Sequence, residues 1–162
     1  EFRRVLFRSA ARPWSRYHHE RPAESDLKQW FQRGENIAVV CGASSDRLIV
    51  LDIDDEEWVA WTLRHKTLLK KFWVVETGSH KLHIYCRSRG DLTTESLDQG
   101  DRHLGEIRGQ GAYVVAPPSR VDEDDHDQMY HQLWGDAEKI PVVHDAKALF
   151  RSLVGEIGRA HV

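Results

Sequence analysis

The sequence predicts an α+β fold, because short apolar strand-like runs outnumber the stretches with helical periodicity. Hydrophobic residues make up 40% and charged residues 30% of the 162 residues, which is typical of a folded globular protein. A chain of this length suits one domain with a sizeable core. The clearest run begins at residue 48, where four aliphatic residues lead into a cluster of carboxylates.

Local signals place the elements along the chain. Strands are expected at residues 36–40, 47–53, 72–76, 81–87, 104–108 and 112–116, with an edge strand at 129–134. Helices are expected at residues 26–33, 56–70 and 143–154. The first two strands are close enough to form a hairpin, and Gly109 and Gly111 predict a tight turn between the fifth and sixth. Residues 89–100 and 122–127 are expected to be loops, the latter without the glycine and spacing of a calcium-binding EF-hand.

Residues 1–9 and 156–162 look foreign to the domain, because they correspond to translations of the two strands of a common sequencing adapter. We therefore expect residues 10–155 to be a single domain from a longer protein, and we leave both ends out of the fold prediction. The nucleotide sequence of the gene tests this expectation, since codons other than those of the adapter at both ends would contradict it.

The net charge is −3, and it is more negative without the two ends. An acidic domain binds a polyanion only through local basic residues or metal ions. Cys41 and Cys86 lie in separate strand-like runs and make neither a zinc pattern nor a disulfide framework, so we expect a reduced, cytoplasmic compartment. No run is long and apolar enough to span a membrane and no signal peptide is recognisable, so no membrane partner is expected.

The first candidate site residues end the run that begins at residue 48. Alternate residues of a strand share a face, so Asp52 and Asp54 point the same way, roughly 6–7 Å apart. Two carboxylates at the end of a buried strand repel each other unless a cation lies between them, and Mg²⁺ prefers such hard oxygen ligands. The alternative is the acidic N-terminus of a helix, for which residues 55–57 are suited.

Two further strands carry polar residues on one face. Lys81, His83 and Tyr85 alternate with apolar residues on one strand, and Glu106 and Arg108 alternate on another. With the two aspartates, these strands supply the carboxylates and cations that metal-assisted phosphoryl or nucleotidyl transfer requires. Taken singly, His83 is more typical of a hydrogen-bonded sheet residue, and Glu106 with Arg108 of a cross-strand surface pair.

Four segments follow one another in a recognisable order. They are NIAVVCG at residues 36–42, LIVLDID at 48–54, VETG at 75–78 with HIY at 83–85, and EIRGQGAYVVAPPS at 106–119. In this order they resemble the N-terminal domain of bifunctional DNA primase/polymerases, the Prim-Pol domain of the archaeo-eukaryotic primase superfamily. The resemblance covers most of residues 12–143, and it implies an RRM-like core in which helices back a mixed or antiparallel sheet.

The resemblance also implies a role for each matching residue. Asp52, Asp54 and Glu106 would bind two divalent ions, Mg²⁺ or Mn²⁺, and with His83 they would form the catalytic set. His83 would contact the phosphates of the incoming nucleotide. The other nucleotide-binding residues would be Lys81, Ser79 and Arg108. No side chain has to act as the nucleophile, since the attacking group would be the 3′-hydroxyl of a primer or nucleotide.

The implied function is template-dependent nucleotidyl transfer by a DNA primase and DNA polymerase that makes and extends primers in DNA replication. The implied partners are a single-stranded DNA template, NTPs or dNTPs, and a fused or separate replicative helicase. Plasmid or virus replication is the implied setting. The sequence departs from the family pattern at His80 and Lys81, where relatives carry glycines, and at Arg120, where relatives often carry a histidine.

Two other functions remain open. An aliphatic strand that ends in Asp-x-Asp also begins the haloacid-dehalogenase-type phosphatases, although these favour threonine or valine where this chain has Glu56. The other alternative is a non-catalytic nucleic-acid-binding module of a replication protein. Primer synthesis on single-stranded DNA separates these alternatives from a polymerase.

Overall fold

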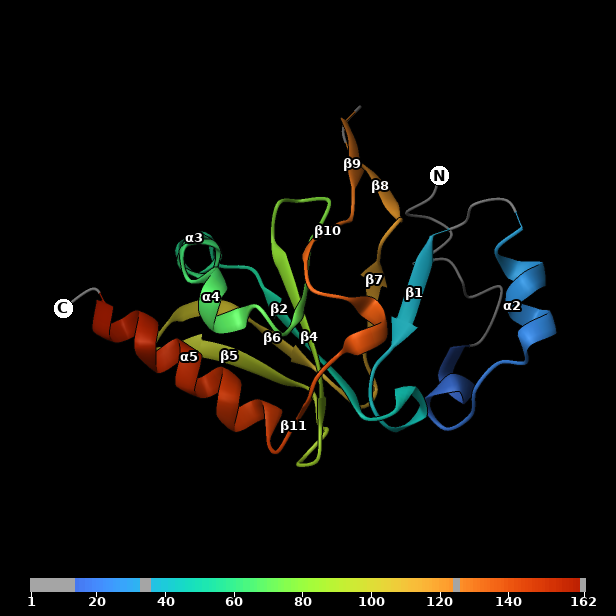
Figure 1. Ribbon diagram of the computed structural model, residues 1–162, viewed down its shortest axis with the longest axis horizontal. Coiled ribbons are helices and arrows are strands. Elements are labelled where there is room, and N and C mark those ends of the chain that lie inside the picture. The colour runs from blue at the N-terminus through green and yellow to red at the C-terminus, as the bar shows by residue number, and fades with distance from the viewer. Residues whose placement is uncertain (1–13, 33–35, 124–125, 161–162) are drawn as a thin grey trace.

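A seven-stranded sheet forms the centre of the computed structural model, which describes residues 14–32, 36–123 and 126–160 (Figure 1). Its strands lie in the order β10-β3-β4-β2-β6-β5, and β11 pairs with β4 alongside this path. The strands of this sheet are β2 (Leu48–Ile53), β3 (Trp73–Glu76), β4 (Leu82–Ser88), β5 (Glu95–Gln99), β6 (Arg102–Arg108), β10 (His131–Trp134) and β11 (Val142–Val143). Every pairing is antiparallel except that of β11 with β4, so the sheet is mixed.

The helices and two smaller sheets complete the fold. The helices are α2 (Glu24–Trp30), α3 (Glu56–Arg64), α4 (Lys66–Leu69) and α5 (Ala146–Ala160), with short 3₁₀ turns η2 (Trp14–His18), η3 (Ala43–Ser45) and η4 (Ala137–Lys139). The smaller sheets pair β1 (Ile37–Val40) with β7 (Tyr113–Ala116), and β8 (Arg120–Glu123) with β9 (His126–Met129). The predicted α+β class is therefore confirmed.

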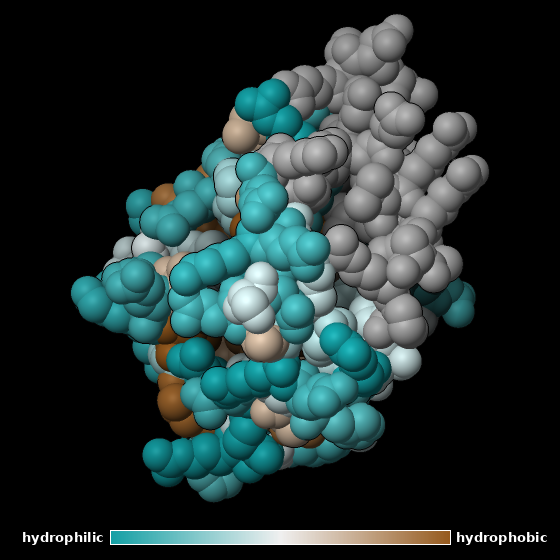
Figure 2. Space-filling model, turned by 90° about the vertical axis from the view of Figure 1, so that its right-hand side faces the viewer, coloured by the Kyte–Doolittle hydropathy of each residue, from teal (hydrophilic) through white to brown (hydrophobic). Residues whose placement is uncertain are grey.

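The central sheet is covered on both faces. On one face α3, α4 and α5 pack over Leu51 and Ile84, with Trp58 and Phe150 among the buried side chains (Figure 1). On the other face the β1–β7 pair packs over Val50 and neighbouring apolar residues. Beyond that pair, the side of the molecule that carries α2 and β1 is mainly hydrophilic where its residues are described (Figure 2).

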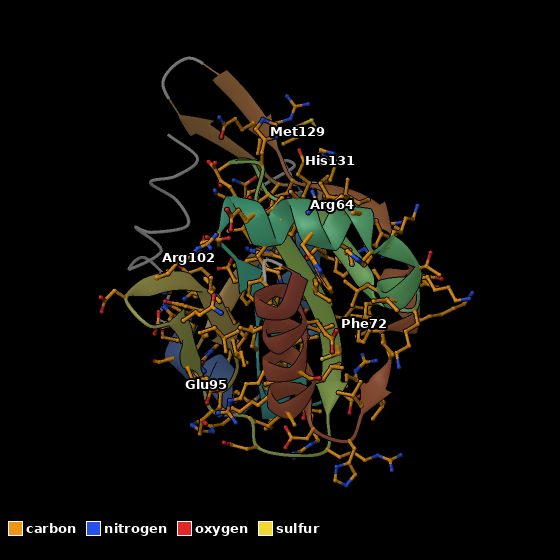
Figure 3. All side chains as sticks on the ribbon, turned by 90° about the vertical axis from the view of Figure 1, so that its left-hand side faces the viewer. Arg64, Phe72, Glu95, Arg102, Met129 and His131 are labelled. Atoms are coloured by element: carbon orange, nitrogen blue, oxygen red, sulfur yellow. The ribbon has the colours of Figure 1, made fainter. Side chains whose placement is uncertain are left out.

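Four strands, β3, β4, β2 and β6, lie side by side and antiparallel. In sequence, α3 and α4 connect the first of them, β2, to β3. This arrangement fits the RRM-like core that the sequence resemblance implies. Asp55 begins α3 as its N-cap, and its carboxylate accepts a hydrogen bond from the Trp58 amide at 2.9 Å. Arg102 of the β5–β6 hairpin holds the same carboxylate at 2.7 Å, which fixes the chain just after β2 (Figure 3).

The hairpin predicted for the first two strands is wrong, whereas the tight turn predicted at Gly109 and Gly111 is present, since the amide of Ala112 donates a hydrogen bond to the carbonyl of Gly109 at 3.0 Å. The two strands that this turn connects do not pair with each other. β1 pairs with β7 rather than with β2, and only an isolated bridge joins Gly42 to Leu48. β6 pairs with β2 and β5 rather than with β7. The reason is that β2 already has a partner on each edge, so β1 and β7 bury their apolar residues by forming a second layer over it.

Several predicted boundaries also change. β5 lies inside the stretch 89–100 that was expected to be a loop, because this edge strand buries a single apolar side chain, Leu97. A β8–β9 hairpin replaces part of the predicted acidic loop. The long helix is interrupted at His65, and α5 begins at Ala146 rather than at residue 143.

The chain ends bear on the predicted domain limits. Residues 1–9 lie outside the described ranges. At the other end, where the sequence predicts a foreign stretch from residue 156, α5 continues through residues 156–160. None of the helices within the described ranges combines the length and apolar character that crossing a bilayer demands.

Candidate active site

Three of the predicted site residues lie in one row across three adjacent strands. In the register of the sheet, Asp52 on β2 is opposite His83 on β4 and opposite Glu106 on β6. Residues directly opposite each other on neighbouring strands lie close enough for their side chains to interact. The core-facing neighbours Leu51, Ile84 and Ile107 point to the helices, so this polar row points to the other face. The sheet therefore brings together the residues that the sequence placed on separate strands.

Asp52 is the centre of this row. Nε2 of His83 lies 3.3 Å from its Oδ1, and Nε of Arg108 lies 3.3 Å from its Oδ2. Burial acts to raise the pKa of Asp52, but the hydrogen bond and charge of His83, followed by Arg108, outweigh it and hold that pKa below its usual value. Asp52 is thus an ionised carboxylate with a side chain only 15% exposed.

Arg108 joins two of the predicted metal ligands. Besides its contact with Asp52, its Nη1 lies 2.9 Å from Oε2 of Glu106. Two carboxylates on neighbouring strands repel each other, and the single positive charge of the guanidinium between them reduces that repulsion. The resemblance implies that Arg108 binds the nucleotide; in the structure its guanidinium lies on these two carboxylates, with a third of its side chain exposed.

Asp54 follows the end of β2 and lies nearer the surface. Its backbone amide donates a hydrogen bond to the Leu104 carbonyl at 3.0 Å, which continues the β2–β6 contact beyond the strand. Partial burial raises the pKa of Asp54, and the negative charge of Asp52 raises it further, whereas His103 lowers it. His103 is a neighbour of this site that the sequence reasoning missed.

The predicted nucleotide-binding residues Ser79 and Lys81 lie on the turn between β3 and β4. Oγ of Ser79 is 3.2 Å from Oγ1 of Thr77, and Nζ of Lys81 is 3.8 Å from a carboxylate oxygen of Glu56 at the start of α3. His80 adopts a φ of 60°, a left-handed conformation that glycine favours. Its Nδ1 lies 2.6 Å from Oε1 of Glu76, which holds the turn in that conformation.

His83 is packed among aromatic rings. The ring centroids of Tyr85 and Tyr130 lie 6.1 Å and 6.0 Å from that of His83. Nδ1 of His83 and the hydroxyl of Tyr85 are buried and have no hydrogen-bond partner among the described residues. Burial raises the pKa of the Tyr85 hydroxyl, so it stays neutral. His83 therefore meets polar groups through Nε2, on the side of Asp52.

The donor chemistry of the site suits a hard divalent ion. Asp52, Asp54 and Glu106 offer carboxylate oxygens, the ligands that Mg²⁺ and Mn²⁺ prefer. Within the described part of the chain, no group of three or more histidine, cysteine or acidic side chains is already arranged to hold a metal ion. Arg108 accounts for this arrangement, because its positive charge already lies on Asp52 and Glu106, two of the three carboxylates.

Replacing Arg108 with methionine is expected to raise the affinity of the protein for Mn²⁺, measured without nucleotide, on the order of tenfold. Methionine removes the positive charge that lies on Asp52 and Glu106 but keeps an unbranched side chain of similar length. Titration followed by the electron paramagnetic resonance signal of free Mn²⁺ measures this affinity. Arg64→Met removes an exposed arginine from α3 and serves as the matched control (Figure 3). An unchanged or weaker affinity in Arg108→Met would show that Arg108 does not compete with the ion.

Comparison with known proteins bears on the identity of this site. The family model described as "Bifunctional DNA primase/polymerase, N-terminal" (Prim-Pol) matches residues 7–143, which is most of the chain. The matched range includes the residues of the row on β4, β2 and β6, and also Asp54 and Arg108. A search of the curated proteins finds no match. Because this match covers every strand of the central sheet and most of the chain, the chain belongs to the Prim-Pol family of bifunctional DNA primase/polymerase N-terminal domains.

Proposed function

We propose that this domain is a template-dependent nucleotidyltransferase that makes primers and extends them by two-metal catalysis. The family gives the general activity of a primase/polymerase. The observation that carries the specific proposal is the row of Glu106, Asp52 and His83 across β6, β2 and β4, with Asp54 just beyond the end of β2. A rigid sheet holds these groups in fixed positions, as metal-dependent catalysis requires.

Each residue of the row has a task in this proposal. Asp52, Asp54 and Glu106 would hold two divalent ions, which lower the pKa of the attacking hydroxyl and stabilise charge on the triphosphate when bound. The guanidinium of Arg108 lies beside these carboxylates and, when the ions take its place on them, would bind a phosphate group. His83 is held by Asp52 and keeps that carboxylate oriented.

The turn between β3 and β4 would form the other side of the nucleotide site. Lys81 directly precedes β4 and, in register, lies beyond His83 on the side of Asp54. Its positive charge would take the place of the backbone contact that glycine allows in relatives, and the exposed Ser79 would offer a hydroxyl to the same phosphates. The attacking 3′-hydroxyl would come from a primer or a nucleotide.

The test of this proposal is synthesis on a single-stranded DNA template with Mg²⁺ or Mn²⁺ and a mixture of NTPs and dNTPs. We expect new primers and extended primers whose sequence follows the template. Absence of both products with a folded protein would contradict the proposal. Phosphatase turnover without polymer would favour an Asp-x-Asp phosphatase, and template binding without either reaction would favour a non-catalytic module.

The proposed function also implies partners for this domain. Single-stranded DNA would be the template, and a replicative helicase, fused or separate, would supply it. We also propose that residues 10–155 are the natural part of this chain.

A further inference from the structure

We propose that His103 of β6 is an additional metal ligand, which shares one ion with Asp54 and is held in place by Asp98. This inference rests on the proposed function, because the ion would be one of the two used in nucleotidyl transfer. It adds a nitrogen ligand to a site for which the sequence predicts carboxylates alone.

A bulge in β6 turns His103 toward the site. With strict alternation, Leu104 would share the face of Glu106, yet Leu104 and Ile107 both lie in the core beneath the helices. The register explains this inversion: Gly105 pairs with Leu97 and His103 with Asp98, so Leu104 is an extra residue. His103 therefore points away from the helix-covered core, where its ring meets Asp54.

The distance between His103 and Asp54 suits two ligands of one ion. Nε2 of His103 lies 3.6 Å from Oδ2 of Asp54, which is too long for a hydrogen bond. Two donors that each lie about 2.1 Å from a shared ion are roughly 3.0–3.6 Å apart. The two side chains are 48% and 47% exposed, so phosphate oxygens and water can supply the remaining ligands.

Asp98 gives His103 the support that metal-binding histidines usually have. Oδ1 of Asp98 lies 2.8 Å from Nδ1 of His103, and Oγ of Ser96 donates a hydrogen bond to the other carboxylate oxygen at 2.8 Å. A carboxylate that accepts the proton of one ring nitrogen leaves the lone pair of the other nitrogen free for a metal. Here that free nitrogen is Nε2, which faces Asp54.

An imidazole ligand has a consequence for the choice of metal. Nitrogen ligands favour first-row transition-metal ions over Mg²⁺, which prefers oxygen. We therefore expect His103 to give the domain a preference for Mn²⁺ over Mg²⁺, and we expect this preference to fall when His103 is replaced.

The experiment uses Mn²⁺ as the probe, added to the whole protein without nucleotide or template. Electron spin-echo modulation from ¹⁴N reports a nitrogen bound to Mn²⁺, and the free Mn²⁺ signal gives the affinity. We expect the modulation in the wild type and its loss in His103→Ala, with Mn²⁺ affinity lowered on the order of tenfold and Mg²⁺ affinity lowered less. Asp98→Asn is expected to weaken Mn²⁺ binding by at most about the tenfold expected for His103→Ala, because Asp98 acts through His103 as its outer-shell partner.

Two variants identify the source of the nitrogen signal. His83→Gln removes the other ring nitrogen near the carboxylates and is expected to keep the modulation, as is His131→Ala on β10, at the opposite end of the strand order from β5 (Figure 3). Modulation or Mn²⁺ affinity unchanged in folded His103→Ala would overturn the inference, as would a wild type that binds no Mn²⁺. The synthesis assay on the wild type distinguishes failure of this inference from failure of the proposed function. If the wild type makes primers and His103→Ala binds Mn²⁺ as tightly as the wild type, the inference is refuted and the proposed function stands.

Discussion

Replacing Asp52 with asparagine is expected to lower the rate of template-dependent synthesis by about 10³-fold or more, the loss that follows when a group that stabilises transition-state charge is removed. Asparagine keeps the shape of the side chain but loses the negative charge. Asp52 is the central residue of the row, so the substitution affects the contacts with His83 and Arg108 as well as the proposed metal site. Primer extension with labelled DNA at saturating Mn²⁺ measures the effect.

The control for this prediction is Asp101→Asn, which removes an exposed carboxylate from the chain between β5 and β6. We expect it to leave synthesis unchanged. Thermal unfolding of both variants shows whether they are folded at the assay temperature, since loss of the ion pairs of Asp52 also affects stability. Activity of folded Asp52→Asn within tenfold of the wild type would contradict the role of Asp52 as a metal ligand.

The sequence is a good guide to the site where a strand stays regular. His83 and Glu106 lie in runs that alternate polar and apolar residues, and Asp52 ends a continuous aliphatic run; the structure confirms that the apolar neighbours of all three form the core. The acidic residues that follow β2 are also explained locally, because Asp55 is the N-cap of α3. These features depend on near neighbours in the chain, and near neighbours are visible in a sequence.

The sequence is a poor guide where pairing depends on distant segments. Nothing local to β1 indicates that its partner is β7, because that choice depends on both edges of β2 being occupied. β5 has few apolar residues because an edge strand buries little, so its composition is that of a loop.

His103 was missed for a related reason. The bulge at Leu104 reverses the face on which His103 lies relative to Glu106, and the position of the bulge depends on the pairing with β5. The contact of Arg108 with both carboxylates is equally a property of the folded sheet.

Replacing Gly105 with alanine is expected to destabilise the fold by about 2–4 kcal/mol, because the new methyl group has no space and the backbone is strained for it. A Cβ at this position would lie 2.1 Å from the carbonyl oxygen of Asp52, and the φ of Gly105 is 153°. The clash would push β6 away from β2 at the row that carries the site, so Mn²⁺ affinity should fall as well. Urea unfolding followed by tryptophan fluorescence measures the stability, since Trp58 and Trp61 are buried in the core.

Gly100→Ala separates the two causes of this loss. Gly100 also has a positive φ, 61°, but a Cβ there would meet no atom within 4 Å, so this variant carries backbone strain without a clash. We expect it to cost about 1 kcal/mol and to leave Mn²⁺ affinity unchanged. If Gly105→Ala is as stable as Gly100→Ala, β6 can move away from β2 without penalty. The close approach of the two strands would then not be what holds Glu106 opposite Asp52, and the site would not depend on a rigid sheet.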